Sequence, residues 1–352
     1  MDSQILDKLR AGCVIPAHPL ALDAGGGIDV RHQRALTRYY LNAGAGGLAV
    51  GVHTTQFAIH DPKVGLLKPV LELAAKTAKE YVEKTHEAAP VMIAGIVGPT
   101  AQAIKEAELA RQTGYHVGLL SLTALAGKPI DELIDHARQV AEIIPLMGFY
   151  LQESISRMVL PGAFWRRFVE IENVAAIKIA PFSRYQTLDV LEAVAASGRS
   201  GEISLYTGND DTIVQDLLTN YRFNIGGKTV GLRMVGGLLG QWACWTHRAV
   251  GVLEQIRDIH ENGKAIPREL LTLAGQLTLA NKAIFDADHN FAGCIPGILH
   301  VLRRQGLVGG IHTLDPHERL APGQAEKIDQ IMSHYPHLTD DSFVRQSLHK
   351  WL

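Results

Sequence analysis

Lys178 has the setting in this sequence that most strongly suggests chemistry. It lies in residues 175–180, a run that is apolar apart from the lysine itself. Burying an ammonium group disfavours its charged form and lowers its pKa, and the neutral amine can then attack a carbonyl carbon. A strand-end lysine can equally reach solvent along its apolar stem, or pair with a distant carboxylate. The local pattern therefore fits both a Schiff-base lysine and a structural one.

Tyr150 and a pair of threonines are the next candidates. Tyr150 ends the apolar run 146–150, where a phenol could relay protons beside a lysine, although strand-end tyrosines commonly only pack. Thr54 and Thr55 follow another apolar run, and their hydroxyl and backbone N–H groups suit a carboxylate. Adjacent threonines are otherwise ordinary loop residues, so these signals gain weight only together.

A repeated architecture must position these residues. Eight short apolar runs alternate with amphipathic stretches, and each run is apolar throughout, as expected for parallel strands covered on both faces. Eight strand–helix units of this spacing predict an α/β fold, a (β/α)8 TIM barrel, over residues 1–240. The predicted strands are residues 13–15, 47–52, 91–96, 117–122, 146–150, 175–179, 203–206 and 229–232.

Beyond residue 240 the pattern becomes helical. Apolar residues at helical spacing predict helices over residues 241–262, 267–287, 293–305 and 323–335. Because no low-complexity linker intervenes, we expect residues 241–352 to form a C-terminal helical region packed on the barrel. Active sites of such barrels form at the carboxyl ends of the strands, which is where the candidate lysine, tyrosine and threonines fall.

The composition argues against several other classes of protein. The 34 Lys and Arg nearly balance 36 Asp and Glu, giving a net charge of −2, so no basic field attracts nucleic acid or an anionic membrane. No apolar run reaches the roughly 20 residues that cross a bilayer, and the first residues lack a signal-peptide pattern. Three cysteines are too few for a disulfide framework. We expect a cytoplasmic protein that acts on a small molecule.

The order and spacing of these residues resemble the dihydrodipicolinate synthase/N-acetylneuraminate lyase family of Schiff-base aldolases. That family has a Gly-Thr-Thr-Gly-Glu loop after strand two, Tyr-Asn-x-Pro ending strand five, and Ile-Lys ending strand six. This sequence has Thr54-Thr55, then Tyr150, then Ile177-Lys178 in the corresponding places. The separation of Tyr150 and Lys178 (178 − 150 = 28) also matches.

The resemblance implies a role for each candidate. Lys178 would form a carbinolamine and then an imine with a 2-oxo acid such as pyruvate. Tyr150 would shuttle the proton, while Thr54 and Thr55 would hold the carboxylate of the 2-oxo acid. We expect no metal and no cofactor. The family's tetramers imply a homo-oligomer here, a homotetramer by resemblance.

Two further residues are candidates for substrate binding. Residues 208–210, Gly-Asn-Asp, resemble a family motif after strand seven and bring in Asn209. Residues 231–237 resemble the glycine-containing stretch at strand eight. Arg233, expected at the end of that strand, could bind a substrate carboxylate through a bidentate fork.

Two departures from the family pattern bear on the substrate. The synthases carry Pro-Tyr-Tyr after strand four, and its second tyrosine completes a proton relay in the neighbouring subunit. Here residues 123–126 read Thr-Ala-Leu-Ala. The synthases also place an arginine shortly after the strand-five tyrosine, where this chain has Ile155. Both differences argue against dihydrodipicolinate synthase itself, and the sialic-acid lyase signature is absent too.

We therefore predict a lyase or aldolase that forms an imine between Lys178 and a pyruvate-type 2-oxo acid. Three alternatives stay open. One is a dehydratase that acts on a deoxy sugar acid through the same imine. Another is a paralogue that binds a 2-oxo acid without catalysis. The third is a metal-dependent barrel enzyme using His18, His53 and His60 with Asp61.

Overall fold

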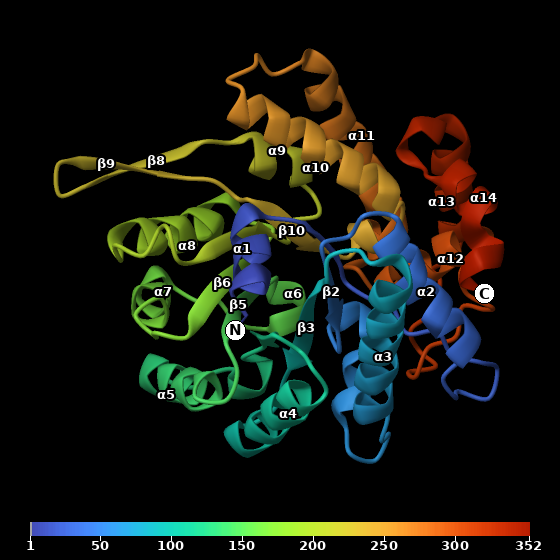
Figure 1. The fold of residues 1–352 in the computed structure, drawn as a ribbon, viewed down its shortest axis with the longest axis horizontal. Helices are drawn as coiled ribbons and strands as arrows, with labels where there is room; N and C mark the ends of the chain where they lie inside the picture. The colour runs from blue at the N-terminus through green and yellow to red at the C-terminus, as the bar shows by residue number, and fades with distance from the viewer. Residues whose placement is uncertain (1) are drawn as a thin grey trace.

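The computed structural model describes residues 2–352, and its centre is a ring of eight parallel strands surrounded by helices (Figure 1). A parallel bridge between Ala17 and Ala49 closes the ring between the first two strands. The predicted (β/α)8 barrel is therefore confirmed. In chain order the strands are β1 (Val14–Pro16), β2 (Gly47–Val50), β3 (Val91–Ile96), β4 (Val117–Leu120), β5 (Leu146–Leu151), β6 (Val174–Ala180), β7 (Ser204–Thr207) and β10 (Gly236–Leu239).

Helices on the outside of the ring bury the outward faces of the strands. Local caps set where some of them begin: the side chain of Asp29 accepts the N–H of His32 at the start of α2, and Ser183 does the same for Gln186 at α8. The outer helices are α2 (Val30–Asn42), α3 (Leu67–Thr85), α4 (Thr100–Gln112), α5 (Ile130–Ala141), α7 (Gly162–Phe168), α8 (Arg184–Ala196) and α9 (Ile213–Leu218).

The amino end of the barrel is closed by the first helix, α1 (Ser3–Ala11). Its Ile5 and Leu9 join the apolar cluster that fills the barrel interior. The hydroxyl of Tyr206, on β7, donates to the carbonyl oxygen of Leu9 at 2.7 Å. Because this end is filled, a substrate can enter only from the carboxyl ends of the strands.

The eighth barrel strand does not lie where the sequence pattern placed it. Residues 229–232 belong to β9 (Lys228–Leu232), which pairs antiparallel with β8 (Tyr221–Ile225) in a hairpin that projects beside α8 (Figure 1). Gly226 and Gly227 form its turn with φ values of +57° and +81°, as a two-residue hairpin turn requires. The strand that completes the barrel is β10. The prediction of 229–232 as the eighth barrel strand was wrong.

The helices after residue 240 contact the barrel at several places. α10 (Thr246–Glu261) lies against β1, and α11 (Arg268–Ile284) lies against α9. α12 (Cys294–Arg304) and α13 (Gln324–His334) follow, close to their predicted ranges. A further helix, α14 (Asp341–Trp351), was not predicted and packs on α2. Within residues 2–352, no helix combines the length and apolarity needed to cross a membrane.

Candidate active site

A small cavity of about 60 Å³ lies at the carboxyl end of the barrel. Its wall comes from residues at or just beyond the carboxyl ends of β1, β2, β5, β6, β7 and β10, together with the connection between α11 and α12. This is the position at which barrel enzymes build their active sites. The residues that line it include Ala17, His53, Thr54, Phe149, Ile155, Lys178, Phe182, Gly208, Asp210, Phe291 and Cys294.

Lys178 points from β6 into this cavity and is 7% exposed. Burial lowers the pKa of its amine to about 8, and the nearby Asp210 carboxylate partly opposes that shift. Gly208 makes room for the lysine side chain, because a Cβ atom there would lie 2.7 Å from Cε of Lys178. The expectation of a buried lysine in an apolar setting is met.

Asp210 is a second titratable group in the cavity wall, and it is not among the site residues predicted from the sequence. Burial raises the pKa of its carboxyl to about 7, with the charge of Lys178 acting in the opposite sense. The backbone N–H of Gln241 donates to Asp210 Oδ1 at 2.9 Å. The side chain of Asn281 donates to its backbone carbonyl at 2.6 Å. Asp210 belongs to the Gly-Asn-Asp motif, but nothing in the motif indicated which side chain lines the cavity.

Phe149, and not Tyr150, is the β5 residue that faces Lys178. The β5–β6 register pairs Leu146 with Val174 but then pairs Met147 with Ala176, so one extra residue lies in β6. Without that bulge Tyr150 would stand opposite the lysine, whereas with it Phe149 does. The Lys178 Nζ atom lies 4.3 Å from the centre of the Phe149 ring.

Tyr150 accordingly lies in the layer between the barrel and its helices. It belongs to the outer apolar cluster, while Phe149 belongs to the inner one. Its ring packs on Trp165 with centroids 5.4 Å apart, and its hydroxyl accepts the N–H of Leu160 at 3.3 Å. Burial raises its pKa to about 12. The expectation that Tyr150 stands beside Lys178 does not hold, because the bulge reverses which face of β5 meets the lysine.

The two threonines occupy different positions in the short helix η1 (His53–Thr55). Thr54 lines the cavity, and its hydroxyl donates to the carbonyl of Ala17 at 2.7 Å. Thr55 is fully buried outside the cavity wall. Its hydroxyl donates to the carbonyl of His18 at 2.7 Å and accepts the N–H of Gly51 at 3.0 Å. Thr55 thus ties the end of β2 to the end of β1.

Asn209 and Arg233 do not line the cavity. The Asn209 amide oxygen accepts the N–H of Phe182 at 3.0 Å, and its NH2 group donates to Thr187 and Asp216 at 3.2 and 3.0 Å. Its side chain therefore fastens the loop after β6 to the loop after β7. Arg233 is exposed and precedes β10, at the opposite end of the barrel from the cavity.

The three histidines considered as metal ligands have separate surroundings. His18 contacts Pro19 O and Thr37 Oγ1, and the His60 ring contacts Glu106 and the Gly51 carbonyl. Only His53 lines the cavity, where burial and the charge of Lys178 lower its pKa to about 4. Across residues 2–352, no three His, Cys, Asp or Glu side chains are grouped to hold a metal ion.

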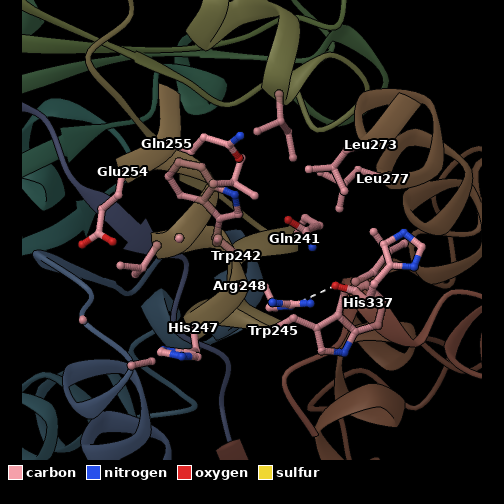
Figure 2. Close-up of a pocket in the computed structure, with 18 of the residues that line it drawn as sticks. Gln241, Trp242, Trp245, His247, Arg248, Glu254, Gln255, Leu273, Leu277 and His337 are labelled. Atoms are coloured by element: carbon pink, nitrogen blue, oxygen red, sulfur yellow. Dashed lines mark hydrogen bonds between the residues drawn. The ribbon is translucent and has the colours of Figure 1, made fainter. Parts of the chain in front are cut away.

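A larger groove, of about 750 Å³, lies between α10, α11 and the short helix η4 (Gln241–Ala243) (Figure 2). Trp242, Trp245 and Leu277 line it, and Arg248 donates to the carbonyl of His337 there. It contains no lysine. Gln241 lies between the two sites, because its side chain lines the groove while its backbone N–H holds Asp210.

Several known proteins resemble this chain. A curated relative, the 4-hydroxy-tetrahydrodipicolinate synthase of Bifidobacterium longum, is 25% identical over 213 residues, which are 59% of this chain and 64% of the relative. The match thus spans less than two thirds of that relative's length. The chloride-inhibited dihydrodipicolinate synthase of Acinetobacter baumannii, complexed with pyruvate, has a TM-score of 0.72 at 18% identity, covering 92% of this chain and 98% of that one.

A second solved structure has a similar fold. The N-acetylneuraminate lyase of Fusobacterium nucleatum has a TM-score of 0.70 at 16% identity, covering 93% of this chain and 99% of that one. At such identities the two structures establish the fold. The sequence profile described as the Dihydrodipicolinate synthetase family matches residues 11–230, more than half of the chain. The chain therefore belongs to the dihydrodipicolinate synthetase family.

Proposed function

We propose that this protein is a lyase that forms a Schiff base between Lys178 and a small 2-oxo acid, with pyruvate as the simplest one. The observation that supports this most directly is the position of Lys178, a buried lysine whose side chain lines a cavity at the carboxyl end of the barrel. Because burial lowers the pKa of this amine, a larger fraction of it is neutral near pH 7 than of an ordinary lysine. The neutral amine is the form that attacks the carbonyl.

Thr54 and the turn around it provide the place for the carboxylate of the 2-oxo acid. The first N–H groups of a short helix have no partner within the helix. In η1 the Thr55 N–H donates to the carbonyl of Val52, whereas the N–H groups of His53 and Thr54, two residues that line the cavity, have no backbone partner within residues 2–352. The Thr54 hydroxyl already donates to Ala17. We therefore assign the carboxylate contact to backbone N–H groups, with the Thr54 side chain fixing the turn.

The remainder of the substrate should be small and uncharged. Ile155 lines the cavity where the synthases are expected to have an arginine for a second carboxylate. Most of the other lining residues are apolar, among them Phe149, Phe182 and Phe291. A 4-hydroxy-2-oxo acid with a short apolar tail fits this wall better than a dicarboxylate. This supports an activity other than that of dihydrodipicolinate synthase.

One observation favours a second candidate, a protein that binds a 2-oxo acid without turning it over. Phe149 faces Lys178, and the Tyr150 hydroxyl lies in the outer layer. Tyr206 pairs with Lys178 across β6 and β7, but its hydroxyl donates to Leu9 at the amino end of the barrel, away from the cavity. Neither tyrosine therefore places its hydroxyl beside the lysine amine. Turnover separates the two candidates. A dehydratase of a deoxy sugar acid would use the same imine and is distinguished by its product.

Reductive trapping tests the proposal. Incubation with pyruvate and borohydride should add one reduced pyruvyl group, which intact mass measures and peptide mapping places on Lys178. Lys178→Met should abolish the adduct. Lys8→Met is the matched control, because burial also lowers the pKa of Lys8, yet its amine contacts Ala89 at the amino end of the barrel. An adduct retained by Lys178→Met would overturn the proposal.

EDTA should leave turnover unchanged, and a metal requirement would favour the histidine alternative.

We further propose a cytoplasmic homotetramer. Two large apolar side chains on α8, Tyr185 and Leu188, are 86% and 42% exposed, and Leu271 and Leu279 on α11 are 57% and 44% exposed. Burying such side chains in a closed symmetric assembly is the usual outcome for an oligomer. Sedimentation velocity at micromolar concentration should give a tetramer, and a monomer would contradict this part of the proposal.

A further inference from the structure

The cavity around Lys178 holds three other titratable side chains: His53, Asp210 and Cys294. Burial lowers the pKa of His53 to about 4 and raises the pKa of the Cys294 thiol well above its usual range. Neither group exchanges a proton readily near neutral pH. Burial acts differently on the carboxyl of Asp210, because it raises the pKa of that group toward neutral pH.

We propose that Asp210 is the acid–base residue of the Schiff-base chemistry at Lys178, in the role that a tyrosine would otherwise fill. This assignment rests on the proposed function. It also stands on geometry, since Asp210 and Lys178 line one cavity from the ends of the adjacent strands β7 and β6. The phenol of Tyr150 lies in the outer layer and contacts Leu160.

The surroundings of Asp210 hold the carboxylate in place and leave one oxygen available. Oδ1 accepts the N–H of Gln241, and the backbone carbonyl accepts the side-chain NH2 of Asn281. The side-chain hydrogen bond found for Asp210 within residues 2–352 involves Oδ1. Asp211, the next residue, does not line the cavity, and it acts on Asp210 only as a nearby negative charge that raises its pKa.

The proton transfers balance without any other reactant. Once pyruvate has formed a protonated imine on Lys178, the Asp210 carboxylate takes a proton from the methyl carbon, C3. The C–H electron pair becomes the C2–C3 double bond, and the former C=N pair moves onto nitrogen, leaving an enamine and a neutral Asp210. In the cleavage direction the carboxylate takes the proton of the 4-hydroxyl, the C3–C4 bond breaks to release an aldehyde, and Asp210 returns the proton to C3.

Exchange of the pyruvate methyl protons in D2O measures this step apart from imine formation. Asp210→Asn should still give the borohydride adduct on Lys178, while methyl exchange followed by proton NMR falls by about 10²–10⁴-fold, the usual contribution of a general acid–base group. Because the Asp210 charge raises the pKa of Lys178, the pH at which trapping is half-maximal should also move lower in the Asn variant. Loss of a residue that only supported the fold would not lower the rate of methyl exchange relative to adduct formation. It would also not shift the pH dependence of trapping in this direction.

Two matched variants complete the test. Asp211→Asn removes the neighbouring carboxyl and should keep exchange within about threefold of the parent. Asp210→Glu keeps a carboxylate but displaces it, so it should exchange faster than Asp210→Asn and at least tenfold more slowly than the parent, with trapping intact. It also carries the test if the Asn variant fails to fold.

The outcomes that overturn the assignment are distinct from those that overturn the function. Near-parental exchange in a trapped Asp210→Asn protein would remove Asp210 from the proton transfer. Loss of trapping in an Asn variant with an unchanged melting temperature would place Asp210 in imine formation and overturn the proton-transfer role. No adduct on the parent protein would overturn the proposed function, and this assignment with it.

Discussion

Phe149 stands opposite Lys178 in the β5–β6 ladder, and the lysine Nζ atom lies 4.3 Å from the centre of its ring. The electron-rich face of an aromatic ring attracts a cation, so this contact favours the ammonium form of Lys178. Burial acts in the opposite sense and lowers the pKa of the amine. The reactive fraction of the amine therefore depends on a balance that one substitution can change.

Phe149→Leu should move the pH dependence of imine trapping to lower pH. Removing the ring removes an attraction to the charged amine, worth about 0.5–1 kcal/mol in typical sites, so the pKa of Lys178 should fall by about half a unit. The measurement is the rate of borohydride trapping with pyruvate between pH 6 and pH 10. A midpoint that moved upward would show that the ring acts mainly by excluding water from Lys178.

Tyr150→Phe should leave turnover near that of the parent. Its hydroxyl lies in the outer layer and accepts the N–H of Leu160. Losing that bond leaves a buried N–H without its partner, which typically costs about 1–3 kcal/mol of stability. Turnover and melting temperature on the same variant check this. A loss of turnover of 10²-fold or more with an unchanged melting temperature would return Tyr150 to the mechanism.

The sequence predicted the barrel because each strand is buried on both faces and reads as a continuous apolar run. It also indicated Lys178 as a candidate Schiff-base residue, because a lysine is the one charged residue in such a run. It could not reveal the bulge in β6, because Ala175 and Ala176 are equally apolar and nothing in their identity shows which of them pairs with Met147. That one residue decides whether Tyr150 or Phe149 faces the lysine.

Two other misplacements also have local physical causes. Residues 229–232 resemble a barrel strand in composition, but the Gly226-Gly227 turn folds them back on β8 as a hairpin. Arg233 follows this hairpin and precedes β10, so it lies at the opposite end of the barrel from the cavity. The Gly-Asn-Asp motif suggested Asn209 as a binding residue, whereas Asp210 is the side chain that lines the cavity. Nothing in the sequence distinguishes these two neighbouring side chains.

The two threonines should respond differently to substitution. Thr55→Val removes a hydroxyl that contacts His18, Gly51 and Val52, so it should lower the melting temperature. Thr54→Val loses its single bond to Ala17 at the cavity wall, so it should mainly raise the KM for the 2-oxo acid. Kinetics and melting curves for both variants check this. Equal KM effects at both positions would mean that Thr55 also contacts the carboxylate.

Asn209→Ala should loosen the cavity wall as well as destabilise the protein. The Asn209 amide oxygen holds the N–H of Phe182, whose φ of +54° is unusual for a phenylalanine. The Phe182 ring packs edge-on against Phe291 at 5.7 Å, and both rings line the cavity. Without the amide, Phe182 should relax toward ordinary backbone angles and shift its ring.

The expected result is a lower melting temperature together with a KM for the 2-oxo acid that rises several-fold while kcat changes less. Leaving buried partners unpaired typically costs about 1–3 kcal/mol of stability per group. Thr187→Val is the matched control, because it removes another bond of the same Asn209 amide without touching Phe182. It should lower the melting temperature and leave KM unchanged. If both variants raised KM equally, the effect would come from general loosening of the loops and not from the position of Phe182.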